Sequence, residues 1–464
     1  TLLTIFVTAD DVRNNSIATR IATQMPANQA IHFITAFITF RFLKLLIQSY
    51  KYSKILLSKC KHFCCIRIWD KLNLQNLNLL MMDTPFIYDR FVTGKNFVGR
   101  KAECTILSNL LEAGEHIYLY GRPKSGKMSI VQQALFNRRM SGKQFMVAHV
   151  SLSNIRNLEQ FLIKFGTAVI KSVSSTAGEY ESLVQKHLEG THFVFDRSRF
   201  ASCDEVVSLN WIPDMNDVCK MIRMPQRIAE ERCRPYYIIM EDFQNLMLAD
   251  DYEDVFKIIE EFFSERDRMK PASASFIMSG SQVNAMKYIF EEKKFFYRQV
   301  EKINMGVVDD REIIEYIVKG FMVSGKVIER DLVLGACKLF RGDMWYMNHF
   351  TAICDTMSRG YINEGILMDA LRTIISIHEP RFYSIVNDLT DHQLSLLLAI
   401  LDGVTRFSAS DVIEKYRLNS SANVRRVKDA LKKKEVITFN EKDEPVILDP
   451  LFEYWVSNHY FERR

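Results

Sequence analysis

The stretch with the clearest chemical signature runs from Gly121 to Lys127. It reads GRPKSGK, so four residues separate two glycines and a lysine follows the second. The four residues after His116 are apolar or aromatic and predict a buried strand, while the residues beyond the stretch predict a helix with Ile130, Val131 and Leu135 on one side. Strand, glycine loop and helix are the setting in which backbone N–H groups and a lysine bind phosphate groups.

The residue after this loop departs from the usual motif. The pattern normally ends in Gly-Lys-Ser or Gly-Lys-Thr, whose hydroxyl ligates Mg²⁺, but Met128 stands here. A thioether is a poor ligand for a hard cation. An ordinary strand-turn-helix is the alternative reading. The favoured interpretation is a nucleotide site with a defective metal shell, built from Gly121, Arg122, Pro123, Lys124, Ser125, Gly126, Lys127, Met128 and Ser129.

Two adjacent carboxylates end another apolar run. Tyr236 to Met240 is apolar or aromatic, and Glu241 and Asp242 follow directly. In P-loop proteins one such acid holds Mg²⁺ and another orients or deprotonates the attacking water. We expect Glu241 to hold the metal and Asp242 the water. The usual order is Asp then Glu, so the exchange moves each carboxylate by one methylene and disfavours hydrolysis more than binding. Solvated acids at a strand end are the alternative.

Two more positions are candidates for contact with the outer phosphate. A strand is predicted from Ala274 to Met278, and Ser279 at its end is a candidate sensor of the terminal phosphate or the water. Its alternative is a helix N-cap, a role that Ser281 fits better. Arg298 precedes a later apolar stretch and is a candidate for stabilising charge, with an exposed structural arginine as the alternative.

Chain length, cysteine content and charge limit the classes of protein that fit this sequence. A chain of 464 residues predicts two or three domains. Nine cysteines without paired CxxC spacing favour reduced thiols and a cytoplasmic protein. The net charge of +5 is misleading, because residues 1–80 carry ten Lys and Arg against three Asp and leave the remainder at −2. Whole-chain charge is therefore no argument for nucleic acid.

The first eighty residues differ from the rest in composition. They are basic and apolar and contain no Glu. Arg41 and Lys44 interrupt their most apolar run before membrane-spanning length, so an interfacial helix is one reading and there is no firm evidence for a membrane. We favour a leader that is poorly ordered or is not part of the native protein, with an initiator at Met81 or Met82.

The C-terminal part has helical patterns and then a different arrangement. Residues 307–388 are helical in pattern, and Pro380 is taken to mark a boundary. Residues 389–464 show helix, helix, longer helix and hairpin, the order of a winged helix-turn-helix. Its third helix is basic and predicts contact with duplex DNA, while protein docking and a solvated face are the alternatives. The candidate DNA contacts are Arg425, Arg426, Lys428, Lys432 and Lys433.

Four motifs in this order resemble the archaeal-type P-loop ATPase family, in the signal-transducing and initiator-related branch of the AAA+ ATPases. They are FVGRKAE at 97–103, the glycine loop, IIMEDFQ at 238–244 and FIMSGS at 276–281. The resemblance covers roughly Phe91 to the C-terminus. It implies an α/β fold with a five-stranded parallel P-loop NTPase sheet flanked by helices, an extra strand between the two nucleotide motifs, a helical lid and a winged helix. It also implies ATP and Mg²⁺, with Phe97, Val98, Gly99 and Arg100 lining the adenine pocket.

These readings divide the chain into a P-loop ATPase core (81–306), a lid (307–388) and a winged helix domain (389–464). Related proteins often carry Gly-x-Pro after a lid helix, where it contacts the nucleotide, but Met344 replaces the proline here. Trp345 and Tyr346 beside it are expected to be core or interface residues. The expected function is an ATP-dependent switch, and the alternative is a non-hydrolysing ATP-binding adaptor. DNA, a partner protein or self-association remain open.

Overall fold

The computed structural model of the protein describes residues 85–265 and 273–462. The predicted leader at 1–80 and the initiator at Met81 or Met82 lie outside these residues. In the described part, no helix is long and apolar enough to cross a membrane. The cysteines of these ranges are free thiols.

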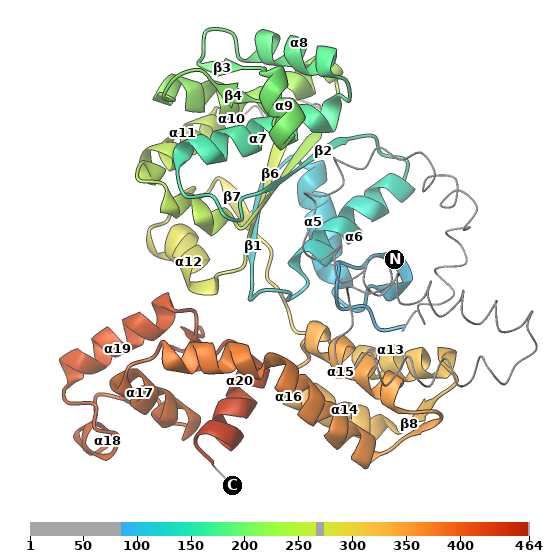
Figure 1. Ribbon diagram of the computed structural model, residues 1–464, viewed down its shortest axis with the longest axis vertical. Helices are drawn as coiled ribbons and strands as arrows, with labels where there is room; N and C mark the ends of the chain where they lie inside the picture. Colours follow the sequence, from blue (N-terminus) through green and yellow to red (C-terminus); the bar gives the residue numbers. More distant parts are fainter. Residues whose placement is uncertain (1–84, 266–272, 463–464) are drawn as a thin grey trace, which may run out of the picture. The chain divides into compact units, whose positions relative to one another are not determined.

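A five-stranded sheet forms the centre of the first part of the chain (Figure 1). Its strand order is β2-β5-β6-β1-β7, and every neighbouring pair is parallel. The strands are β1 (His116–Tyr120), β2 (Met146–Ser151), β5 (Tyr236–Glu241), β6 (Ala274–Gly280) and β7 (Val300–Lys302). The prediction of a parallel sheet is confirmed, and β6, which lies between β5 and β1, is the extra strand expected between the two nucleotide motifs.

Helices cover both faces of this sheet. One face carries α5 (Lys101–Glu112) and α6 (Lys127–Met140), and the other carries α7 (Leu158–Val173), α10 (Met215–Arg232) and α11 (Tyr252–Ser264). Successive strand residues face opposite sides. In β5, Tyr237 and Ile239 pack with α5 and α6, whereas Ile238 and Met240 pack in the other apolar cluster.

A small excursion lies between α7 and α10. The sequence predicts irregular structure at 190–214, but the structure contains helix α9 (Arg197–Cys203) there and an antiparallel pair, β3 (Phe193–Val194) with β4 (Ser208–Leu209). Asp196 caps α9 by accepting the Ser198 N–H at 2.8 Å. The helix of seven residues and the two-residue strands are too short to give a periodic pattern. Helix α8 (Ala177–His187) precedes β3 in the chain.

The remainder of the chain is mainly helical. After α12 (Val283–Lys287), four lid helices follow: α13 (Asp310–Val323), α14 (Arg330–Phe340), α15 (Met344–Met357) and α16 (Glu364–Asn387). Two short strands, β8 (Val327–Ile328) and β9 (Tyr361–Ile362), pair within them. The predicted winged helix order is confirmed by α17 (Asp391–Leu401), α18 (Ser410–Lys415), α19 (Ser421–Lys433), the hairpin β10 (Ile437–Phe439) with β11 (Pro445–Ile447), and α20 (Pro450–Trp455).

Helix α16 continues through Pro380, so no helix end lies at the boundary predicted there. Proline lacks only its own N–H and leaves the carbonyl of Ser376 without a helical donor, and the helix carries on to Asn387. Packing is also continuous here. Buried side chains of the lid and of the winged helix, Phe340 and Trp455 among them, belong to one apolar cluster.

Candidate functional site

The loop between β1 and α6 curls because Gly126 takes a left-handed conformation with φ 90°. Glycine adopts this conformation without the steric penalty of other residues. The Arg100 guanidinium donates to the Ser125 carbonyl at 2.9 Å and so holds the loop from outside. Since α6 starts at Lys127, the helix N-terminus adds partial positive charge at the same place.

Lys127 is buried at the centre of this loop. Its ammonium donates to the carbonyls of Gly121 at 2.8 Å and Arg122 at 2.9 Å. Burial lowers the pKa of Lys127 to about 8, against the opposing pull of the Asp242 and Glu241 carboxylates. The two carboxylates therefore favour the charged form of the lysine.

Glu241 and Ser279 lie on the sheet face that α6 covers. They are register partners on β5 and β6, and each follows the alternation that places Ile239 and Ile277 against α6. Ser279 is fully buried, and its hydroxyl has no hydrogen-bond partner among the described residues. The N-cap alternative does not apply to it, because α12 begins at Val283.

Glu241 has a partner that the sequence did not suggest. The Nε2 of His149, on the adjacent strand β2, lies 3.0 Å from a Glu241 carboxylate oxygen. This hydrogen bond lowers the pKa of Glu241. A metal ion at Glu241 would have to share the carboxylate with the imidazole. Only the period-two pattern of β2 pointed to His149, since Val147 two residues earlier packs on the same face.

Asp242 ties two strand ends together. Its backbone is left-handed, with φ 58°, and it precedes the 3-10 helix η2 (Phe243–Leu248). Its carboxylate accepts the Ser281 hydroxyl. Gln244 donates to that hydroxyl at 3.1 Å and accepts the Ser281 N–H at 3.3 Å. Ser281 is thus held to Asp242 and does not cap α12 through its side chain.

Few side chains near the phosphate loop could ligate Mg²⁺. Met128 packs against the apolar cluster under α6, and the Ser129 hydroxyl accepts the Val92 N–H at 3.1 Å. The neighbouring hydroxyl is therefore already engaged and does not replace the missing one. Glu241 is the remaining acid that could ligate Mg²⁺, and its carboxylate is already hydrogen-bonded to His149. These residues fit a phosphate chain well and a protein-held Mg²⁺ poorly.

The segment from Phe97 to Arg100 connects the sheet region to the lid. Phe97 packs on the cluster under α6, whereas Val98 packs on the lid cluster. Gly99 is left-handed with φ 65°, and a Cβ there would lie 2.6 Å from a Val308 methyl carbon. The chain passes too close to the lid for any larger residue, which places this segment beside both the phosphate loop and α13.

Arg298 is not brought together with these residues. It is exposed and precedes β7, whose Val300 pairs with His116, the first residue of β1. The phosphate loop follows the last residue of β1, so the two lie at opposite edges of a parallel sheet. The Arg298 guanidinium instead lies over the Tyr297 ring at 5.1 Å. The charge-stabilising role predicted for it has no geometric support within this chain.

Side chains of the phosphate loop reach the lid. Arg122 forms an ion pair with Asp343, the N-cap of α15, and lies 4.7 Å from the centre of the Tyr346 ring. Lys124 lies over Trp345 at 4.6 Å. Trp345 and Tyr346 belong to the first turn of α15, and both serve this contact.

The five basic residues singled out on α19 separate into two groups. Lys428 lies over the Phe439 ring at 4.3 Å, and Lys432 pairs with Glu292 of the sheet region at 3.2 Å. The other three are exposed and have no acidic partner in the described part of the chain. These three are Arg425, Arg426 and Lys433.

Comparisons with known proteins agree with this architecture. A family model described as a "probable winged helix domain" matches residues 380–458. A search of curated proteins found no match. Among solved structures, a Walker-type ATPase of Pyrococcus abyssi is 14% identical with a TM-score of 0.56, over 80% of this chain and 99% of that one. The ORC2 protein of Aeropyrum pernix, solved in ADPNP–ADP complexes, is 14% identical with a TM-score of 0.50, over 79% and 96%.

At these identities the likeness shows the fold and no more. The chain therefore has the fold of a P-loop ATPase, with a helical C-terminal region that carries a winged helix domain.

Proposed function

We propose that this protein binds ATP at the phosphate loop and acts as a nucleotide-dependent switch. The observation that carries the proposal is Lys127, a buried ammonium whose donors face two backbone carbonyls. Burial makes its charge unfavourable, and a phosphate chain would compensate it better than carbonyls do. The solved ADPNP–ADP complexes of a protein with this fold support the choice of nucleotide.

Each residue has a defined task in this proposal. The backbone N–H groups of the loop and Lys127 bind the phosphates, and the segment from Phe97 to Arg100 borders the base. Ser279, with its unpartnered hydroxyl, touches the terminal phosphate. Mg²⁺ would neutralise phosphate charge and would be held mainly by the phosphates, with Glu241 as its protein ligand.

A series of contacts leads from Asp242 to the winged helix and suggests how nucleotide binding affects that domain. Asp242 holds Ser281, and α12 starts two residues later. The Glu435 carboxylate of the winged helix accepts the N–H groups of Asn284 at 2.8 Å and Ala285 at 3.1 Å. A shift of Asp242 on nucleotide binding would therefore be transmitted through one turn to the winged helix.

Titration calorimetry with ATP, with and without Mg²⁺, tests the proposal. We expect ATP to bind in the cup in both conditions, because the metal shell depends little on the protein. The Lys127→Ala protein should bind ATP about a hundredfold more weakly. Absence of adenine-nucleotide binding to the unaltered protein in both conditions would overturn the proposal.

A second candidate is an adaptor that binds ATP without hydrolysing it. Met128 at the metal position and the engagement of Glu241 by His149 favour it. A phosphate-release assay distinguishes the two. Turnover that disappears in both Lys127→Ala and Asp242→Asn supports a hydrolysing switch. Bound ATP without phosphate release in the unaltered protein supports the adaptor.

For the winged helix, we propose contact with duplex DNA through Arg425 and Arg426. Both are exposed on the first half of α19 and have no acidic partner in the described residues, so their charge is available to phosphates. Docking of a partner protein on the same face is the competing possibility. Its distinguishing result is DNA binding that does not change when both arginines are removed.

A further inference from the structure

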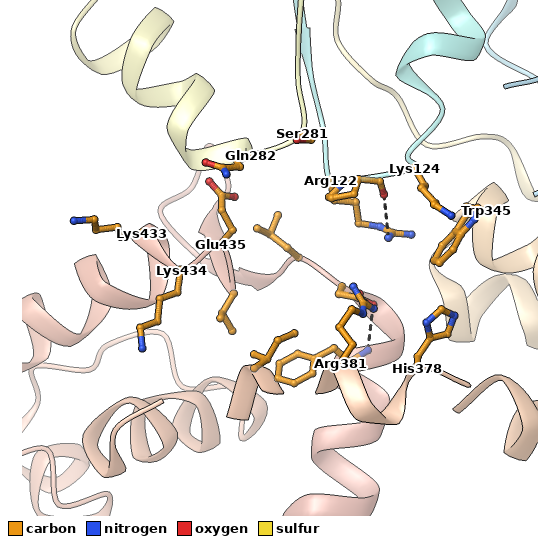
Figure 2. A pocket seen from close by; sticks show the side chains of 16 residues that line it. Arg122, Lys124, Ser281, Gln282, Trp345, His378, Arg381, Lys433, Lys434 and Glu435 are labelled. Carbon is orange, nitrogen blue, oxygen red and sulfur yellow. Dashed lines mark hydrogen bonds and ion pairs between the residues drawn. The ribbon is translucent and has the colours of Figure 1, made fainter. Parts of the chain in front are cut away.

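A cavity of about 540 Å³ lies beside the phosphate loop, between the lid and the winged helix (Figure 2). This volume is in the range of small-molecule sites. Four parts of the chain line it: the loop, the turn after β6, the lid helices α15 and α16, and the winged helix. The side chains that matter below are Arg122, Lys124, Trp345, His378, Arg381 and Asp449.

The residues that line the cavity differ from those that form the phosphate cup. The cup is made by backbone N–H groups and Lys127, while the cavity is lined by Arg122, Pro123 and Lys124 of the same loop. Lys127, Glu241 and Asp242 are not among its lining residues. The loop therefore contributes Lys127 to the cup, and Arg122, Pro123 and Lys124 to the cavity.

The charge in the cavity is positive and partly neutralised, since Arg122 pairs with Asp343 and Lys434 pairs with Asp388. Asp449 is occupied, since it accepts Arg381 at 2.6 Å and the Tyr346 hydroxyl at 2.8 Å. The Glu435 carboxylate already accepts hydrogen bonds from two N–H groups of α12. Lys124 has no acidic partner among the described residues, and its ammonium lies over the Trp345 ring.

The cations gather on one side of the cavity. Figure 2 shows Arg122, Lys124 and Arg381 around Trp345 and His378, while Lys433 and Lys434 lie on the other wall with their ammonium groups turned away. Guanidinium and ammonium groups are the usual partners of phosphate oxygens, and an indole ring offers a flat apolar surface. Burial lowers the pKa of His378 to about 4, so its ring is neutral and adds no charge at neutral pH.

We propose that this cavity is a second anion site, which takes a small phosphate-bearing molecule between Lys124, Arg122 and Arg381. Its ligand would contact the phosphate loop, the lid and the winged helix at once. Occupancy would therefore stabilise the arrangement in which these parts are in contact.

The test uses the full chain, with tripolyphosphate as the probe in titration calorimetry. The unaltered protein should bind two anions, one in the cup and one in the cavity. Lys127→Ala should retain one, and adding Lys124→Gln to it should weaken that remaining binding at least tenfold. Lys124→Arg should restore it because the charge returns.

The matched control is Lys319→Ala, which removes an exposed lysine of α13 that does not line the cavity. It should leave both binding events unchanged. Loss of all tripolyphosphate binding in Lys127→Ala would overturn the proposal, as would equal binding by Lys127→Ala with and without Lys124→Gln. The ATP titration is independent of these results, so the nucleotide proposal can stand if the second site fails.

Discussion

The phosphate loop and helix α19 both concentrate positive charge, but they do so in different surroundings. Lys127 is 8% exposed and is fixed by two carbonyls, and Arg100 is held against the loop. On α19, Arg425 and Arg426 are exposed and make no ion pair in the described structure. A buried cation has a fixed orientation, and leaving it without a partner costs free energy. An exposed cation is solvated and its side chain is mobile.

The difference bears on what each region can recognise. A fixed, desolvated cation favours one ligand geometry and gives a large free-energy change when it is removed. Solvated arginines attract any phosphate backbone and contribute small, salt-dependent increments. Four experiments test this contrast.

The largest effect should come from Lys127→Ala. Removing the buried ammonium from the cup should weaken ATP binding about a hundredfold, ~2.7 kcal/mol. Calorimetry measures this change, and circular dichroism checks that the fold is kept. An affinity within threefold of the unaltered protein would mean that Lys127 is not a phosphate ligand.

The next effect concerns the contact between α12 and the winged helix that carries α19. Asn284 is buried, and its amide donates to the carbonyls of Lys432 at 3.0 Å and Ile437 at 2.8 Å. Asn284→Ala leaves both carbonyls unsatisfied and should lower the free energy of unfolding by about 2 kcal/mol. Denaturant unfolding measures it. The exposed Asn216, which makes a 3.3 Å hydrogen bond, gives the control Asn216→Ala, and equal losses in the two variants would refute this account.

A pH effect separates a buried lysine from a solvated one. Lys127 must carry its proton to bind phosphate, and burial lowers its pKa in the free protein to about 8. ATP affinity should therefore be flat below pH 7.5 and fall roughly eightfold by pH 9. Calorimetry across this range tests it, and Lys127→Arg should show no such decline. A flat profile for the unaltered protein would count against a titrating lysine in the cup.

The smallest effects are expected on α19. Replacing Arg425 and Arg426 by Ala should change the free energy of unfolding by less than about 0.5 kcal/mol. Duplex DNA affinity should fall, and the slope of log affinity against log salt should decrease by roughly two, one per arginine. Fluorescence anisotropy at several salt concentrations measures both. An unchanged slope would favour protein docking on this face.

Much of this architecture could be predicted from the chain. The glycine loop, the strand ending in Glu241 and the winged helix order all have local signatures, and the structure contains each of them. Interactions between distant segments could not be predicted in this way. His149 reaches Glu241 only because β2 and β5 are neighbours in the sheet, and Ser281 reaches Asp242 only because β5 and β6 are.

Two predictions rested on spacing alone, and the structure adds what spacing does not report. Arg298 was a candidate for stabilising charge because it precedes an apolar stretch, but parallel strands place a residue before β7 at the edge opposite the loop. Pro380 was taken as a boundary, and α16 continues through it because a long helix tolerates one missing N–H where its other face is well packed. Sequence spacing alone reports neither the sheet edge nor the packing.

The uninterrupted helix α16 has a mechanical consequence. It runs from Glu364 to Asn387, and the side chains on both sides of its end share one apolar cluster. A rigid rod with a common core cannot fold at its middle without exposing that core. Any swing of the C-terminal half should therefore pivot upstream, in the connection between Lys302 and Asp310, and carry the lid helices and the basic helix together as a single arm.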